Sequence, residues 1–110
     1  MRLEARQKCI TILKGWAQAI PIIGQVYIFG SRIKCTNSPS SDLDIAVSLI
    51  FEDRDTSLAY WIAHQEEWQS SLAVKFEWAV DLHLLDFTPG AIVTTGVADA
   101  SILVYDRNGV

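Results

Sequence analysis

The stretch YIFGSRIKCTNSPSSDLDIAV, residues 27–47, decides the fold of this chain. Two apolar runs flank a segment of Gly, Ser, Pro and Asn, which is the pattern of a strand, a loop and a second strand. The second run begins with two aspartates, Asp42 and Asp44, and continues directly into apolar residues. Two carboxylates this close repel each other, and one of them takes up a proton unless a cation lies between them. Paired negative charge at the start of a buried strand therefore indicates a site.

Helical and strand periodicities extend outward from this stretch. Apolar residues recur at helical spacing from about Leu3 to Ile20, where Pro21 ends the pattern. The acidic segment 52–55 indicates a helix start, because carboxylates favour that end of a helix. The helix that follows, to about Ala73, should have apolar residues on one side: Leu58, Trp61, Ile62, Trp68 and Leu72. Strands are predicted over residues 25–29, 43–51, 75–85 and 102–105.

The order of these elements predicts an α/β or α+β fold, with helices packed on a sheet of about four strands. The run after Asp44 is so apolar that both faces of its strand should be covered. With 110 residues, of which 50% are hydrophobic, the chain suits one compact domain over residues 1–110.

Charge is distributed unevenly, although the formal net charge is only −4. Up to Ser41 there are six Lys or Arg residues and one acidic residue. From Asp42 onward there are three Lys or Arg residues and twelve acidic residues. This asymmetry reflects either solvated faces, or a cationic part that binds polyanions beside an acidic part that binds metal ions. Cys9 and Cys35 lack the number and spacing of a disulfide framework or a zinc site. No apolar run has the length of a membrane helix, so we expect no membrane association and a cytoplasmic location.

Asp42 and Asp44 are two positions apart, so on one strand their carboxylates should project from the same face. Leu43 and Ile45 then point into the core. Mg²⁺ suits such a pair, because it prefers hard oxygen ligands and binds through a few carboxylates plus substrate phosphates.

A third carboxylate lies on the strand predicted over residues 75–85. There Asp81 and His83 share the less apolar face, because side chains alternate along a strand. If this strand lies beside the one that begins near Asp44, Asp81 completes a group of three carboxylates. Three carboxylates can hold two metal ions.

Gly30 and Ser31 directly follow the first strand of the opening stretch. Glycine lets a ligand approach the backbone closely, and the serine hydroxyl and neighbouring N–H groups can donate hydrogen bonds to a phosphate. Arg32 and Lys34 add positive charge, and Arg32 suits either a phosphate contact or a salt bridge. A phosphate-binding turn on one strand end and a metal site on the next are the minimum for nucleotide chemistry.

The pattern GS, ten intervening residues and DLD, at positions 30–44, resembles the signature of the DNA polymerase β-like nucleotidyltransferases, in particular their minimal members. The residues around it that also match are Phe29, Arg32, Pro39 and Ser41. The triplet VDL at positions 80–82 matches the context of the family's third carboxylate, and the segment 102–106 is similar to the usual end of minimal members. The resemblance therefore covers nearly the whole chain, and it implies an α+β fold with a mixed sheet of about four strands flanked by helices.

The resemblance implies ATP as substrate, two Mg²⁺ ions, and transfer of a nucleoside monophosphate to an acceptor hydroxyl with release of pyrophosphate. By the same resemblance, Asp42 and Asp44 hold both ions, and Asp81 ligates one of them and helps to deprotonate the acceptor. The nucleotide-binding residues would be Gly30, Ser31 and Arg32. Minimal members act as antitoxins that AMPylate a tyrosine of a HEPN-type toxin. We therefore expect a protein adenylyltransferase with such a partner and no direct binding of nucleic acid.

Alternatives stay open at this point. A non-catalytic antitoxin could neutralise its partner by complex formation alone, which the small size and the surplus of aromatic residues suit. Trp61, Trp68 and Trp78 belong either to the core or to such a partner surface. Modification of a small molecule is a third option. His83 either contacts substrate or is only packed in the sheet.

Overall fold

The computed structural model describes residues 3–34 and 42–109 of the 110-residue chain. Three residues of the sequence pattern, Cys35, Pro39 and Ser41, lie outside the described residues. Within these ranges, no helix combines the length and the apolar character that crossing a bilayer requires.

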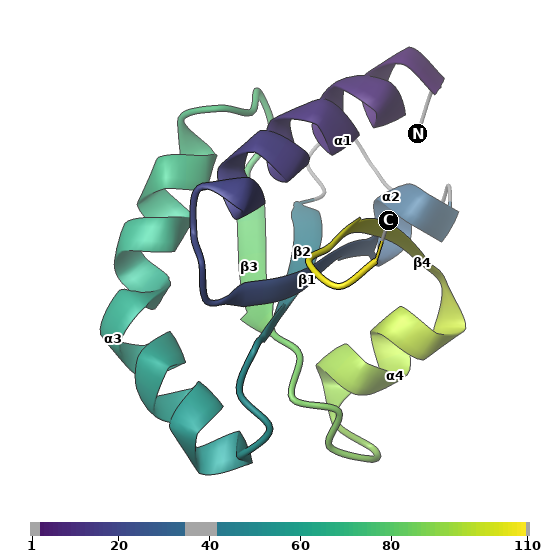
Figure 1. Cartoon of the computed structure of the whole chain (residues 1–110). Coiled ribbons are helices and arrows are strands. Elements are labelled where there is room, and N and C mark those ends of the chain that lie inside the picture. Colours follow the sequence, from purple (N-terminus) through teal and green to yellow (C-terminus); the bar gives the residue numbers. More distant parts are fainter. Residues whose placement is uncertain (1–2, 35–41, 110) are drawn as a thin grey trace.

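The centre of the fold is a four-stranded mixed sheet with the strand order β3-β2-β1-β4 (Figure 1). β1 (Ile23–Phe29) runs antiparallel to both of its neighbours, β2 (Leu43–Leu49) and β4 (Ser101–Asp106). β2 and β3 (Val80–Leu84) pair in parallel. The predicted α+β fold with a mixed sheet of four strands is therefore confirmed.

Two long helices cover one face of the sheet. Leu13 of α1 (Leu3–Gln18) and Leu72 of α3 (Arg54–Ala73) are fully buried in the main core, together with alternate residues of the strands. α3 also connects the parallel strands β2 and β3, a connection that needs a crossover of this kind. In Figure 1, α1 crosses above the sheet and α3 lies along its left side.

A shorter helix covers part of the opposite face. α4 (Ile92–Asp99) packs there through Val93 and Val97 against a smaller cluster formed by Phe29, Ala46 and Leu85. β2 is thus covered from both sides, which explains its nearly continuous apolar sequence and confirms the expectation for this strand.

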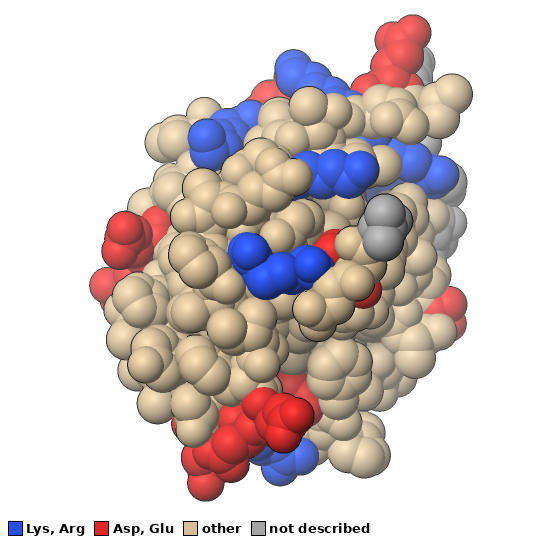
Figure 2. Space-filling model, viewed as in Figure 1, with Lys and Arg blue, Asp and Glu red and all other residues tan. Residues whose placement is uncertain are grey.

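The acidic segment 52–55 begins α3, as predicted. The side chain of Asp53 accepts a hydrogen bond from the Thr56 N–H at 3.0 Å and so caps the helix. Figure 2 shows Asp and Glu gathered near this end of α3, whereas Lys and Arg gather over α1. The uneven charge of the sequence is therefore visible on this face of the protein.

Two local predictions are wrong. β3 begins at Val80 and not near Lys75, because residues 75–79 form turns from which aromatic side chains pack against the core. Leu58 and Ile62 are 44% and 61% exposed, although helical spacing placed them on the buried side of α3. Apolar residues occur around most of this helix, so their spacing alone did not single out the side that faces the sheet.

The tryptophans of the sequence belong to the core. Trp68 is 5% exposed and joins the main core, and Trp61 and Trp78 are partly buried against it. Trp68 also contacts the ring of Trp16 edge-on, with centroids 6.4 Å apart. The core interpretation of these residues is therefore confirmed over the partner-surface interpretation.

Leu13 and Leu3 offer a matched test of this core on one helix. Leu13 is fully buried, whereas Leu3 is 70% exposed. We expect Leu13→Ala to lower the free energy of unfolding by about 2–5 kcal/mol, and Leu3→Ala to change it by less than about 0.5 kcal/mol. Urea unfolding followed by circular dichroism measures both values. Equal losses in the two variants would contradict the core described here.

Candidate active site

The parallel pairing of β2 and β3 brings together acidic side chains from separate strands. Asp44 is the Cα partner of Asp81 in this ladder. Because side chains alternate between the faces of a sheet, both carboxylates project away from the main core, while Leu43 is fully buried on the core side. The expectation that the two strands lie side by side is confirmed.

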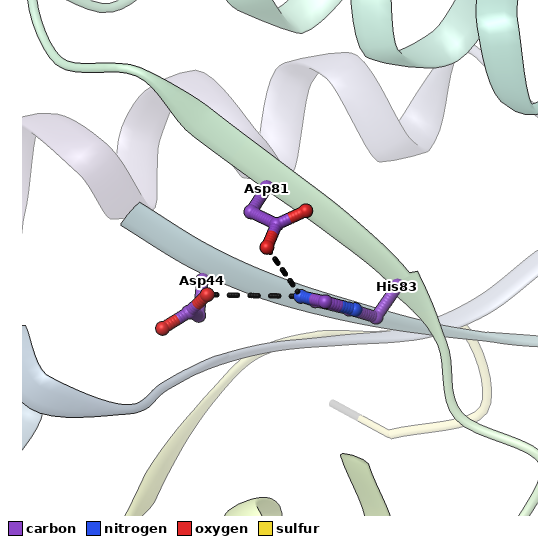
Figure 3. A group of neighbouring side chains, drawn as sticks. All are labelled: Asp44, Asp81 and His83. Atoms are coloured by element: carbon purple, nitrogen blue, oxygen red, sulfur yellow. Dashed lines mark ion pairs between the residues drawn. The ribbon is translucent and has the colours of Figure 1, made fainter. Parts of the chain in front are cut away.

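His83 lies between the two carboxylates (Figure 3). Its Nε2 atom is 3.1 Å from Asp81 Oδ2 and 3.6 Å from Asp44 Oδ1. One ligand atom from each of the three residues lies within 4.8 Å of the other two. Among the described residues these three form the group able to hold a metal ion, and we call Asp44, Asp81 and His83 the acidic centre.

Asp44 is the more enclosed carboxylate, with 26% of its side chain exposed against 51% for Asp81. Burial raises the pKa of Asp44 above its ordinary value; the His83 imidazole opposes this rise, and the Asp81 carboxylate adds to it. The positive charge that the protein places near Asp44 therefore does not fully balance the negative charge of its ionised carboxylate. Such a site favours a bound cation.

Gly30 lies against the acidic centre. Its φ of 84° is in the left-handed region, and a Cβ atom at this position would overlap Asp44 Oδ2 and lie 3.1 Å from Asp44 Cγ. Both the backbone angle and the contact therefore require glycine. The next residue begins α2 (Ser31–Lys34), a single helical turn.

The other predicted site residues take separate positions. Ser31 is half-buried at the start of α2. Arg32 is buried, and its guanidinium carbon lies 4.5 Å from the centre of the Trp78 ring. Asp42 is exposed, precedes β2 by one residue and is not a member of the acidic centre. The roles that the motif implies for these residues stay predictions.

A side chain of α3 closes the outer edge of β3 beside the acidic centre. Gln69 donates a hydrogen bond from Nε2 to the Val80 carbonyl and accepts one from the Leu82 N–H at 3.0 Å. These two backbone groups bracket Asp81, so Gln69 fixes the segment that carries this carboxylate. The sequence carried no signal for this contact, because a glutamine on a helix does not reveal which backbone it meets.

The donor set fits a divalent cation. Carboxylate oxygens are the ligands that Mg²⁺ prefers, and an imidazole nitrogen suits transition ions. Asp81 is half-exposed and thus open to a substrate, whereas Asp44 is held between strands. A cation held by such a centre would help to neutralise phosphate charge, and a carboxylate there can accept a proton, as phosphoryl and nucleotidyl transfer require.

The sequence profile of the family described as Polymerase beta, Nucleotidyltransferase matches residues 7–109. The chain belongs to this family. The family-level resemblance seen in the motifs is thereby confirmed, and the nucleotidyltransferase fold accounts for the mixed sheet with its flanking helices. No curated protein matches the chain.

Chains of three solved structures share this nucleotidyltransferase fold. A toxin–antitoxin with AMP-PNP is 22% identical, with a TM-score of 0.64 over 92% of this chain and 74% of that one. A mutant of the toxin–antitoxin MntA–HpeT is 19% identical, with a TM-score of 0.66 over 90% of this chain and 74% of that one. A chain from a complex of tri-AMPylated Shewanella oneidensis HEPN toxin with MNT antitoxin is 20% identical, with a TM-score of 0.59 over 93% of this chain and 72% of that one. At these identities the likeness shows the fold alone.

His83 is the member of the acidic centre that the sequence left undecided. The signal that could have selected it is the alternation that puts it on the same face as Asp81. That signal alone does not tell a ligand from a packed side chain. The structure adds the contact of His83 with Asp44, which comes from another strand.

Gly30→Ala and Gly90→Ala separate backbone strain from the contact with Asp44. Gly90 has a similar φ of 80°, but a Cβ there meets nothing within 4 Å. We expect Gly90→Ala to lower the free energy of unfolding by about 1 kcal/mol, and Gly30→Ala by at least about 1 kcal/mol more. Urea unfolding measures this difference, and its absence would show that Gly30 does not pack against the carboxylate.

Asp44→Asn tests the electrostatic strain of the site. The raised pKa means that the folded state holds the Asp44 proton more tightly than the unfolded state, so ionisation near neutral pH destabilises the fold. In EDTA at pH 7 we expect the variant to be more stable than the parent, by less than about 1 kcal/mol because solvent screens this partly exposed group. The gain should vanish as the pH falls below about 4, where the carboxyl is protonated in both states.

Thermal unfolding at several pH values measures this effect. Glu67→Gln removes one negative charge from an exposed position on α3, away from the acidic centre, and serves as the control. A variant at Asp44 that is less stable than the parent at pH 7 would show that the folded protein stabilises the ionised carboxylate.

Proposed function

We propose that the chain is a Mg²⁺-dependent nucleotidyltransferase that transfers AMP from ATP to a hydroxyl group of a protein partner. The proposed acceptor is a tyrosine of a HEPN-type toxin, so that the chain acts as an antitoxin. The observation that carries this proposal is the acidic centre on adjacent strands, in a chain of the polymerase beta nucleotidyltransferase family. In this proposal residues 1–110 act as a single minimal nucleotidyltransferase domain.

Each predicted site residue has a role in this proposal. Asp42, Asp44 and Asp81 bind two Mg²⁺ ions, which when bound neutralise the charge of the nucleotide phosphates. The uncompensated charge of Asp44 supports a cation at this place. The residues that contact the nucleotide are Gly30, Ser31 and Arg32.

The proposed reaction forms one bond to phosphorus and breaks another. The oxygen of the acceptor hydroxyl bonds to the α-phosphorus of ATP, and the bond from that phosphorus to the oxygen shared with the β-phosphate breaks. Pyrophosphate leaves with the electron pair of that bond. Asp81, whose side chain is 51% exposed, takes the proton of the hydroxyl and releases it to solvent.

The solved structures support the choice of nucleotide and acceptor. One contains AMP-PNP, an analogue of ATP, and another contains a HEPN toxin that is tri-AMPylated and bound to an MNT antitoxin. A third carries two Asp-to-Glu substitutions two positions apart, which is the spacing of Asp42 and Asp44. Because these likenesses concern the fold, the activity and partner of this chain are inferred from them together with the acidic centre.

A second candidate function is neutralisation of the partner by complex formation alone. The tryptophans no longer favour it, since they pack in or against the core. Exposed apolar side chains do favour a partner contact, and those on α3 and α4 include Leu58, Ile62 and Ile92.

AMP transfer is tested by incubating the protein with Mg²⁺, ATP labelled at the α-phosphate, and the protein encoded by its genomic neighbour. We expect label on the neighbour, and a decrease of about 10²–10⁴-fold for Asp81→Asn, which removes the proton acceptor. The double variant Asp42→Asn/Asp44→Asn should also lose transfer. Glu77→Gln, an exposed carboxylate outside the acidic centre, is the matched control and should retain it.

The same variants separate the two candidate functions. If the parent transfers no label, and the Asp variants still bind and neutralise the partner, complex formation alone is the function. If neutralisation is lost while the complex still forms, catalysis is required.

A further inference from the structure

We propose that His83 Nε2 is a protein ligand of the metal ion at the acidic centre, so that the centre binds imidazole-accepting transition ions more tightly than Mg²⁺. This inference rests on the proposed function for the presence of a metal ion. It adds His83 to the carboxylates that the proposed function assigns to the metal ions, because the imidazole lies within the acidic centre.

The spacing of the ligand atoms matches a coordination shell. At metal–ligand distances of about 2.1 Å, neighbouring ligand atoms lie about 3.0 Å apart in an octahedral shell and about 3.4 Å apart in a tetrahedral one. Nε2 is 3.1 Å from Asp81 Oδ2 and 3.6 Å from Asp44 Oδ1. The ligand atoms of the two carboxylates lie within 4.8 Å of each other, so one ion can contact all three residues once the Asp44 and Asp81 side chains turn toward it.

The imidazole is held in this position by packing. Its ring makes an edge-to-face contact with Phe29, with centroids 5.6 Å apart. Phe29 is only 6% exposed and lies against α4, where a Cβ atom at Gly96 would be 2.9 Å from Phe29 Cδ2. A ring restricted in this way loses little rotamer entropy when its nitrogen binds an ion.

The chemistry of the ligand atoms determines which ion is bound more tightly because of His83. Mg²⁺ takes oxygen ligands and keeps several waters, whereas Co²⁺ and Zn²⁺ accept nitrogen and oxygen ligands together. A neutral imidazole adds no negative charge to that of Asp44 and Asp81, so it adds little to the attraction for a hard cation. Two carboxylates with one imidazole therefore favour the transition ions.

Calorimetric titrations of the metal-free protein with CoCl₂ and with MgCl₂ test this selectivity. They are done at pH 7.5, above the ordinary imidazole pKa of about 6.5. The test variant is His83→Ala, and the matched control is His64→Ala, because His64 on α3 is the other of the two histidines in the chain. Thermal unfolding shows whether each variant is folded.

We expect the parent to bind Co²⁺ at least about 10-fold more tightly than Mg²⁺. His83→Ala should weaken Co²⁺ binding by about 10–100-fold and leave Mg²⁺ binding nearly unchanged. His64→Ala should change neither. The Co²⁺-loaded parent should also show imidazole proton resonances shifted by the paramagnetic ion, and this spectrum tests ligation even if His83→Ala does not fold.

Three results would overturn the proposal: equal affinities of the parent for the two ions, an unchanged or higher Co²⁺ affinity in folded His83→Ala, or no shifted imidazole resonances. A higher affinity would mean that the imidazole competes with the ion. The proposed enzyme activity is tested by a separate measurement, the transfer of AMP to the partner. Selective Co²⁺ binding without AMP transfer would support His83 as a metal ligand and contradict the proposed enzyme activity. AMP transfer with no effect of His83→Ala on metal binding would support the enzyme activity and contradict His83 as a ligand.

Discussion

The parallel pairing of β2 with β3 is the constraint on which the site depends. Its register sets Asp44 opposite Asp81, and the alternation of side chains along β3 then places His83 on the same face. A shift of either strand by one residue would turn its polar side chains toward the main core, where Leu43 and Val80 are now buried. The packing that stabilises the sheet therefore also determines which charged groups meet.

The acidic centre lowers the stability of the fold, and contacts from the surrounding elements hold its side chains in place. Asp44 is partly buried beside a second carboxylate, which raises its pKa. Gly30 adopts a left-handed backbone angle so that β1 can end against this carboxylate. On the outer side, Gln69 fixes the backbone on both sides of Asp81. Strain and uncompensated charge of this kind are common at functional sites, where a ligand supplies the missing interaction.

Family membership and local chemistry inform different parts of the functional conclusion. The polymerase beta nucleotidyltransferase family accounts for the sheet and for carboxylates on adjacent strands. Toxin–antitoxin chains share the fold at about 20% identity, and the partner and acceptor are proposals that start from this likeness. The imidazole between the carboxylates is a feature of this chain's own structure, and it bears on which ion the centre prefers.

By itself, the sequence determined the strand–loop–strand unit, the glycine before α2, and the shared face of Asp81 and His83. These features follow from local periodicity and from the backbone freedom of glycine. Only the tertiary structure decided that β2 and β3 are parallel neighbours and that His83 reaches Asp44. It also decided that Leu58 and Ile62 are exposed. The physical reason is that periodicity specifies the face of an element but not its neighbour, which is set by packing between residues far apart in the chain.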